Sequence, residues 1–169
     1  MKTRSASKKL PLALSVAIVA ALCVLPLFFR GEPPLREARL GGTPTLTGAR
    51  PLFIHPLSIG AARISVAFAQ TPADQERGLS GTASLAADEG MLFIFGAPQS
   101  PAFWMKDMQY PIDIIWIGED KKVIGYTERA VPESYPETYT AAAPVRYVLE
   151  VNAGFAKKHG VKPGTAVSF

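Results

Sequence analysis

Hydrophobic residues after position 60 recur in short runs that predict β-strands. In "ARISVAFA" (62–69), Ile64, Val66 and Phe68 point to one face while the positions between them face the other way, which is the two-residue period of a strand. The run "IDIIWIG" (112–118) is apolar on both faces, as expected of a central strand. The remaining predicted strands are "GMLFIFG" (90–96), "KKVIGYTE" (121–128), "VRYVLEV" (145–151) and "TAVSF" (165–169).

Two short helices are predicted between these strands. The first covers residues 71–79, with Thr71 as N-cap and Pro72 at the first helical position. The second covers residues 152–160, with Asn152 as N-cap and basic residues in its last turn. About six or seven strands with two short helices predict a mainly β fold, a small β-sandwich or barrel-like domain.

The first fifty residues follow a different pattern, which predicts three segments ahead of this domain. Residues 10–29 contain no charged residue, and a helix of twenty residues spans the ~30 Å apolar core of a bilayer. The basic segment 1–9 precedes this run, and a linker rich in Pro and Gly follows it at 30–50. The sequence therefore predicts a transmembrane anchor or signal segment in front of a single β-rich domain at 51–169.

Positive charge is concentrated before the predicted domain. Residues 1–30 contain five Lys and Arg and no acid, whereas residues 31–169 contain thirteen Lys and Arg against fourteen Asp and Glu. The body therefore lacks the basic surplus that a nucleic-acid-binding protein needs, and nucleic acid is not an expected partner. Four basic residues before the apolar run and only Arg30 directly after it predict that the amino terminus lies in the cytoplasm.

This orientation predicts a single span in the bacterial inner membrane, with the body facing the periplasm. No small-x-small cleavage site follows the apolar run, which favours an anchor that is retained. The alternative is a cleaved signal, which would leave a periplasmic or secreted protein.

Cysteine and methionine bear on the possible cofactors. Cys23 is the only cysteine and lies in the apolar run, which excludes disulfides, thiol catalysis and thiolate metal sites in the body. Met105 and Met108 are soft ligands suited to Cu(I), but methionine more commonly fills gaps in an aromatic core. The sequence also lacks phosphate-binding loops, zinc spacings and Ser-His-Asp arrangements. We therefore predict no cofactor and no metal.

Three stretches together resemble one protein family: "ERGLSGTASLAADEGMLFIF", "FWMKDMQYPIDIIWI" and "YVLEVNAGFAKKHGVKPGTAV". They are similar to the blocks of the bacterial and archaeal family called domain of unknown function 192, in the same order, over roughly residues 60–169. The resemblance implies a mostly β domain that often follows a signal or anchor. The family's activity is not established, so no catalytic residue is carried over. After "FWMK" the family typically has Asn, where this chain has Asp107.

The stretch "FWMKDMQYPIDIIWI" places charged residues among large apolar ones. Together with the turn at "ERGL" it predicts a candidate pocket for a ligand, formed by Glu76, Arg77, Trp104, Lys106 and Asp113. Asp113 lies in an apolar strand, where a carboxylate must be paired or hydrogen-bonded. We expect a salt bridge from Asp113 to Arg77 or Lys106, with a polar ligand pocket as the alternative.

Two classes of function follow from these residues. The first is a non-catalytic accessory or small-ligand-binding domain, whose partners would be the inner membrane and a small polar ligand or an envelope protein. The second is a carbohydrate-active hydrolase that uses Asp113 and Glu150 as its two carboxyl groups. Strand alternation directs Glu150 away from the face of Leu149 and Val151, which predicts an exposed or paired carboxylate.

Overall fold

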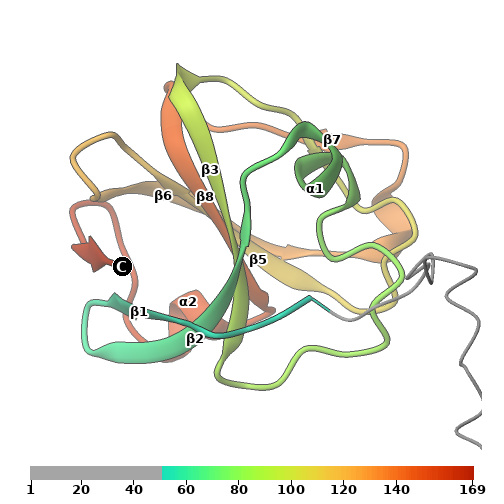
Figure 1. Cartoon of the computed structure of the whole chain (residues 1–169), viewed down its shortest axis with the longest axis horizontal. Coiled ribbons are helices and arrows are strands. Elements are labelled where there is room, and N and C mark those ends of the chain that lie inside the picture. Colours follow the sequence, from blue (N-terminus) through green and yellow to red (C-terminus); the bar gives the residue numbers. More distant parts are fainter. Residues whose placement is uncertain (1–50) are drawn as a thin grey trace, which may run out of the picture. The chain divides into compact units, whose positions relative to one another are not determined.

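A curled sheet of seven strands forms the body of the protein, as the computed structural model of residues 51–169 shows (Figure 1). The order of the strands across the sheet is β6-β5-β8-β3-β2-β1-β9. In chain order they are β1 (His55–Ile59), β2 (Ala62–Ala69), β3 (Glu89–Gln99), β5 (Ile112–Ile117), β6 (Val123–Ala130), β8 (Val145–Asn152) and β9 (Val167–Ser168). The predicted segments 1–9, 10–29 and 30–50 lie outside the described residues.

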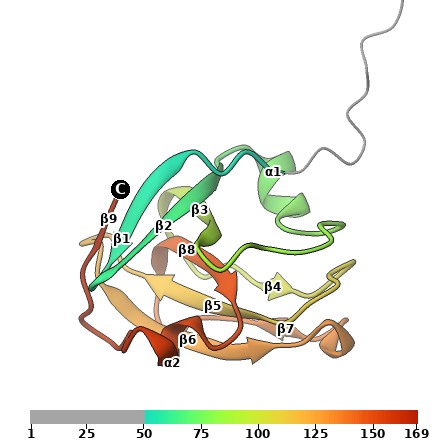
Figure 2. The same cartoon turned by 90° about the horizontal axis from the view of Figure 1, so that it is seen from below.

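Shorter elements complete the described part of the chain. A second sheet pairs β4 (Phe103–Trp104) with β7 (Thr138–Tyr139). The helices are α1 (Pro72–Arg77), α2 (Phe155–Lys158) and the 3-10 helix η1 (Pro132–Ser134). Figure 2 shows α1 and the β4–β7 pair on the right, with β9 and α2 towards the left. No helix among residues 51–169 is long and apolar enough to cross a membrane.

The predicted mainly β fold with two short helices is confirmed, and the large sheet curls into a half-barrel. Backbone hydrogen bonds tie the C-terminal segment to the start of β6. The N–H of Val123 donates to the carbonyl of Thr165 at 2.9 Å, and the N–H of Val167 donates to the carbonyl of Lys121 at 2.9 Å. These bonds link the two ends of the curled sheet, which limits the exposed strand edge.

The strand predictions at 62–69, 90–96, 112–118 and 145–151 are confirmed by β2, β3, β5 and β8. Strand β1 was not predicted. Its sequence "HPLSI" is short and contains Pro56, which weakens a strand pattern. Tertiary pairing with both β2 and β9 makes it a strand nevertheless.

Alternate residues of the strands enter two apolar clusters, one on each face of the sheet. On one face, Leu149 and Val151 of β8 pack with Ile115 of β5 and with residues of α2. On the other face, Val148 and Ile114 pack with aromatic residues of β3 and β4. Because both faces are covered, every residue of β5 is buried, as predicted for a central strand.

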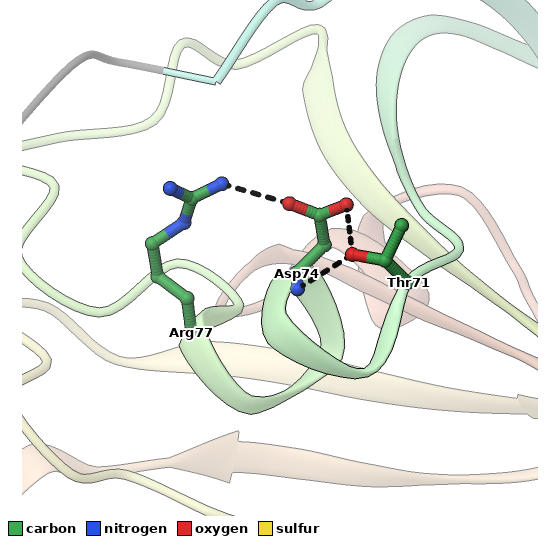
Figure 3. A network of polar contacts seen from close by, with 3 residues as sticks. All are labelled: Thr71, Asp74 and Arg77. Carbon is green, nitrogen blue, oxygen red and sulfur yellow. Dashed lines mark hydrogen bonds and ion pairs between the residues drawn. The ribbon is translucent and has the colours of Figure 1, made fainter. Parts of the chain in front are cut away.

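Helix α1 forms as predicted and α2 differs from its prediction at one end. The Thr71 hydroxyl accepts from the N–H of Asp74 at 3.1 Å, as an N-cap does (Figure 3). The prediction that Asn152 is the N-cap of α2 is wrong. The side chain of Asn152 instead donates to the carbonyls of Leu85 and Ala86, and Gly154 is the N-cap residue.

Candidate functional site

Asp113 is completely buried and is held by main-chain donors. Its Oδ1 accepts from the N–H of Arg129 and the N–H of Gly154, both at 3.0 Å. Its Oδ2 accepts from the N–H of Ala156 at 2.9 Å. The carboxylate therefore caps the start of α2 from a neighbouring strand, in the way that an N-cap side chain would.

The bond to Arg129 also explains an irregularity of the sheet. The pairing of β5 with β6 shifts between Ile112 and Ile114, opposite Asp113, and Arg129 has a φ of +52°. A bulge of this kind removes an amide from the ladder of interstrand hydrogen bonds. Asp113 accepts from that amide, so it joins the bulge of β6 to α2.

The predicted salt bridge of Asp113 with Arg77 or Lys106 is wrong. Arg77 pairs instead with Asp74, with Nη2 and Oδ1 3.0 Å apart, and Figure 3 shows the guanidinium reaching back to that carboxylate. None of the ion pairs among residues 51–169 includes Asp113. The expectation that a buried carboxylate must be paired or hydrogen-bonded was correct. Peptide N–H groups, rather than a cationic side chain, bond to Asp113.

Asp113 and Glu150 lie on opposite faces of the sheet. In the β5–β8 pair, Asp113 stands opposite Val151 and Ile114 stands opposite Glu150. Residues that pair across two strands share a face, and consecutive residues alternate between faces. The hydrolase hypothesis needs both carboxyl groups beside one glycosidic bond. Two carboxyl groups on opposite faces of the sheet cannot lie beside the same glycosidic bond.

A cavity of about 310 Å³ opens over the face that carries Glu150, between α1, β3, β4 and β8. Its walls are largely apolar and aromatic, and its polar groups come mainly from α1 and the turn after it. The lining residues are Gln75, Glu76, Arg77, Gly78, Leu79, Ser80, Phe93, Phe95, Pro101, Ala102, Phe103, Trp104, Met108 and Glu150. A cavity of this size and composition is typical of sites for small molecules.

Glu150 is the unusual group in this cavity. Glu150 is only 5% exposed, and its Oε2 is buried without a hydrogen-bond partner among the described residues. Burial away from water disfavours the charged form and raises the pKa of Glu150 from 4.5 to about 8. The carboxyl group is therefore mostly protonated at neutral pH. The expectation that Glu150 is exposed or paired is wrong, because α1 and β4 cover this face of β8.

Gly78 brings the backbone of the α1 turn close to Glu150. A Cβ atom at this position would lie 3.2 Å from Cζ of Phe93 and 3.7 Å from Oε2 of Glu150. Its φ of +51° is also a conformation that residues with a side chain rarely adopt. Glycine therefore keeps this side of the cavity open.

Aromatic side chains form much of the remaining wall. Phe93 and Phe103 pack edge to face, with ring centroids 4.8 Å apart, and Phe103 contacts Trp116 in the same manner at 5.6 Å. Trp104 is 42% exposed, so it lies at the mouth of the cavity. The sequence placed Trp104 in the candidate pocket but did not include the phenylalanines there. Phe93 and Phe103 belong both to the apolar core and to the wall of the cavity.

The structure brings together most of the predicted site residues. Glu76, Arg77 and Trp104 line the cavity. The same three residues, with Lys106, also line an adjoining hollow of about 330 Å³. Asp113 lines neither of these spaces, since it lies on the other face of the sheet. Sequence reasoning missed Glu150 as the central group, although its position in the apolar run "YVLEVN" was the available signal.

Lys106 and Asp107 lie in an exposed turn. Asp107 has a φ of +56°, and its carbonyl accepts from the N–H of Gly81 at 2.9 Å. Both Asn and Asp tolerate this left-handed conformation better than most residues. Asp107 is thus suited to a conformational role at this position.

Metal binding has no obvious location in the described domain. Among residues 51–169, no group of three His, Cys, Asp or Glu side chains lies close enough to hold a metal ion. The polar groups of the cavity are one buried carboxyl group and the side chains of α1 and its turn.

Comparison with protein families gives a match over nearly the whole described domain. Residues 56–169 match the family DUF192, described as "Uncharacterized ACR". The chain belongs to the DUF192 family. The resemblance inferred from the three sequence blocks is therefore confirmed, and the cavity with Glu150 is a feature of a DUF192 domain. No curated protein matches the chain significantly.

Two crystal structures are similar to this DUF192 protein. One is a candidate transcription regulator from Sinorhizobium meliloti 1021, with 35% identity and a TM-score of 0.64, covering 67% of this chain and 91% of that one. The other is a protein of unknown function from Novosphingobium aromaticivorans DSM 12444, with 33% identity and a TM-score of 0.66, covering 76% of this chain and all of that one.

Proposed function

We propose that this protein is a non-catalytic domain that binds a small ligand outside the cytoplasm. The observation that carries the proposal is the cavity of about 310 Å³ with the buried, unpartnered carboxyl group of Glu150 in its wall. A buried polar group without a partner destabilises the folded protein, by roughly 1 to 3 kcal/mol. A ligand that bonds to Oε2 would remove that cost on binding, which makes the group useful in a binding site.

The position outside the cytoplasm rests on the sequence of the first thirty residues. The uncharged run 10–29 would hold the chain in the inner membrane or direct its export, and the linker 30–50 would separate the domain from the membrane. A reporter enzyme that is active only after export, fused after Phe169, should then be active. Activity only from a reporter that requires the cytoplasm would contradict this part of the proposal.

We do not extend to this chain the function named for the Sinorhizobium meliloti protein. Residues 51–169 contain ten Lys and Arg against twelve Asp and Glu. A nucleic-acid interface needs a surplus of basic residues to neutralise phosphates. The charge of the domain therefore favours a small ligand as its partner.

Ligand binding is tested by screening a fragment library against the full chain in a non-ionic detergent. The wild type is compared with a variant in which a large side chain blocks the cavity. Ala102 is exposed and lines the cavity, so Ala102→Trp should block the entrance without disturbing the core. Ala97 is exposed on β3 and does not line the cavity, so Ala97→Trp is the matched control. Fragments should bind the wild type and Ala97→Trp but lose affinity for Ala102→Trp. Hits that bind all three proteins equally would contradict the proposed site.

A further inference from the structure

Glu150 lacks a counter-charge within the described protein. Ion pairs among residues 51–169 include Asp74 with Arg77, Asp120 with Lys122, and Glu119 with Arg146, and Glu150 takes part in none of these. Its Oε2 is buried and also lacks a hydrogen-bond donor. An ionised carboxylate at this position would need a positive group from outside the chain.

The walls of the cavity suit a positively charged group. Phe93, Phe95, Phe103 and Trp104 all line the space around Glu150. The face of an aromatic ring carries partial negative charge and attracts ammonium groups, and this attraction strengthens where water is excluded. Aromatic rings grouped around a carboxylate are a known arrangement for holding organic cations, because the rings replace the water of hydration that the cation loses.

The other charged residues of the cavity do not oppose this arrangement strongly. They are Glu76 and Arg77, both on α1. Glu76 adds a second negative charge to the lining. The guanidinium of Arg77 is bound by Asp74 at 3.0 Å, and its side chain is largely exposed to solvent, which weakens its repulsion of a cation in the cavity.

We propose that the cavity binds a small organic cation, an ammonium group on an aromatic or aliphatic body, with the carboxylate of Glu150 as its counter-ion. This inference rests on the proposed ligand-binding function and specifies the chemical class of the ligand. The ammonium group contacts Oε2, which otherwise has no partner, and the apolar body of the ligand fills the aromatic part of the cavity.

Binding of a cation is coupled to loss of a proton from Glu150. In the free protein the pKa of this group is about 8, because of burial, so the carboxyl group is mostly protonated at pH 7. A cation binds the ionised form, and binding therefore releases close to one proton per ligand. The affinity should rise about tenfold per pH unit below pH 8 and become constant above it, since it follows the ionised fraction. A neutral ligand that accepts a hydrogen bond from the protonated group would show the opposite dependence.

The test is isothermal titration calorimetry of the full chain in a non-ionic detergent with three probes of similar shape. These are 2-phenylethylammonium, 2-phenylethanol and phenylacetate, each titrated at pH 6, 7 and 8.5. Two buffers with different ionisation enthalpies report the protons released. We expect the ammonium probe to bind at least about tenfold more tightly than the alcohol at pH 8.5, with proton release at pH 7.

The variant Glu150→Gln separates charge from shape. It keeps the size of the side chain and removes its ionisation, so the affinity for the ammonium probe should fall at least about tenfold at pH 8.5 while the affinity for the alcohol is unchanged. Glu137→Gln, in an exposed loop, is the control and should behave as wild type. A melting curve shows that each variant is folded.

Three outcomes overturn the inference. Equal binding of alcohol and ammonium, without proton release, would show a neutral ligand and leave the proposed function intact. Tightest binding of phenylacetate would point to Arg77 as the recognising group. Failure of all three probes at millimolar concentration would exclude this ligand class, while the screen with Ala102→Trp tests the proposed function separately.

Discussion

Two buried carboxyl groups, on neighbouring strands, have opposite environments in this protein. Asp113 on β5 is fully buried and accepts three hydrogen bonds from peptide N–H groups. Glu150 on β8 is buried almost as deeply, and its Oε2 has no partner among the described residues. They differ by one position of register, which puts them on opposite faces of the sheet.

The difference separates a structural group from a candidate functional one. A satisfied carboxylate fixes the elements that donate to it, here the bulge of β6 and the start of α2. A buried carboxyl group without a hydrogen-bond partner destabilises the fold. When such a group lines a cavity that a ligand can enter, as Glu150 does, it is a candidate for ligand binding. Burial alone therefore does not identify the functional acid. The hydrogen-bond partners of each acid do.

The largest expected effect comes from removing the charge of Asp113. In Asp113→Asn, the amide group would face the N–H of Ala156, and three bonds to a charged acceptor would be lost or weakened. At about 1.5 kcal/mol for each bond, the free energy of unfolding should fall by up to about 4.5 kcal/mol. Urea denaturation measures this change, and Glu137→Gln in the exposed loop should change it by less than about 0.5 kcal/mol. Equal stabilities of the two variants would contradict the structural role of Asp113.

Glu150→Gln should raise the free energy of unfolding, whereas Asp113→Asn should lower it. The raised pKa means that the folded state keeps a proton that the unfolded state loses above pH 4.5, so the wild type loses stability as the pH rises from 4.5 to about 8. Glutamine does not ionise, and the variant should be more stable than wild type by about 3 kcal/mol at pH 7.

The pH dependence of this difference provides an internal control. The stability of Glu150→Gln minus that of the wild type should be near zero at pH 4, grow by about 1.4 kcal/mol per pH unit, and become constant above pH 8. Other titrating groups cancel in the difference. A flat difference across this range would mean that Glu150 has an ordinary pKa, and that the contrast with Asp113 does not exist.

Gly78→Ala should have a smaller effect, and it changes the cavity as well as the stability. The added methyl group would lie 3.2 Å from Phe93, and alanine would have to adopt the φ of +51° that glycine has here, which is strained for a residue with a side chain. The variant should therefore be destabilised by about 2 kcal/mol. Thermal unfolding measures this cost. Gly81→Ala is a useful control, because its φ of +73° is also unfavourable while nothing lies within 4 Å of its Cβ position. A larger cost at Gly81 would mean that crowding near Glu150 is unimportant.

The smallest effect is expected at the surface of α1. The ion pair of Arg77 with Asp74 is exposed to solvent, and pairs of this kind contribute about 0 to 1 kcal/mol. Arg77→Gln should therefore lower the free energy of unfolding by no more than about 0.5 kcal/mol, in low salt, and less in high salt. A loss of several kcal/mol in urea denaturation would show that Arg77 has a structural role that its exposure does not suggest.

The sequence by itself determined the mainly β class, the family, the α1 cap at Thr71 and the full burial of β5. These properties depend on local patterns, because the two-residue period, the capping residues and the apolar runs are written into consecutive positions. It also determined that Asp113 must be bonded, since a buried charge cannot remain alone. The pocket was located in part, through Glu76, Arg77 and Trp104.

Only the tertiary structure decided which partners the two carboxyl groups have. The donors to Asp113 come from residues 16 to 43 positions away, and they are peptide groups whose direction depends on a bulge and on the position of α2. The cover over Glu150 comes from α1 and β4, which are distant in sequence from β8. An alternating pattern gives two faces but does not say whether the second face meets water or another element of the same chain. For that reason Glu150 reads as an exposed residue in the sequence and as the centre of a cavity in the fold.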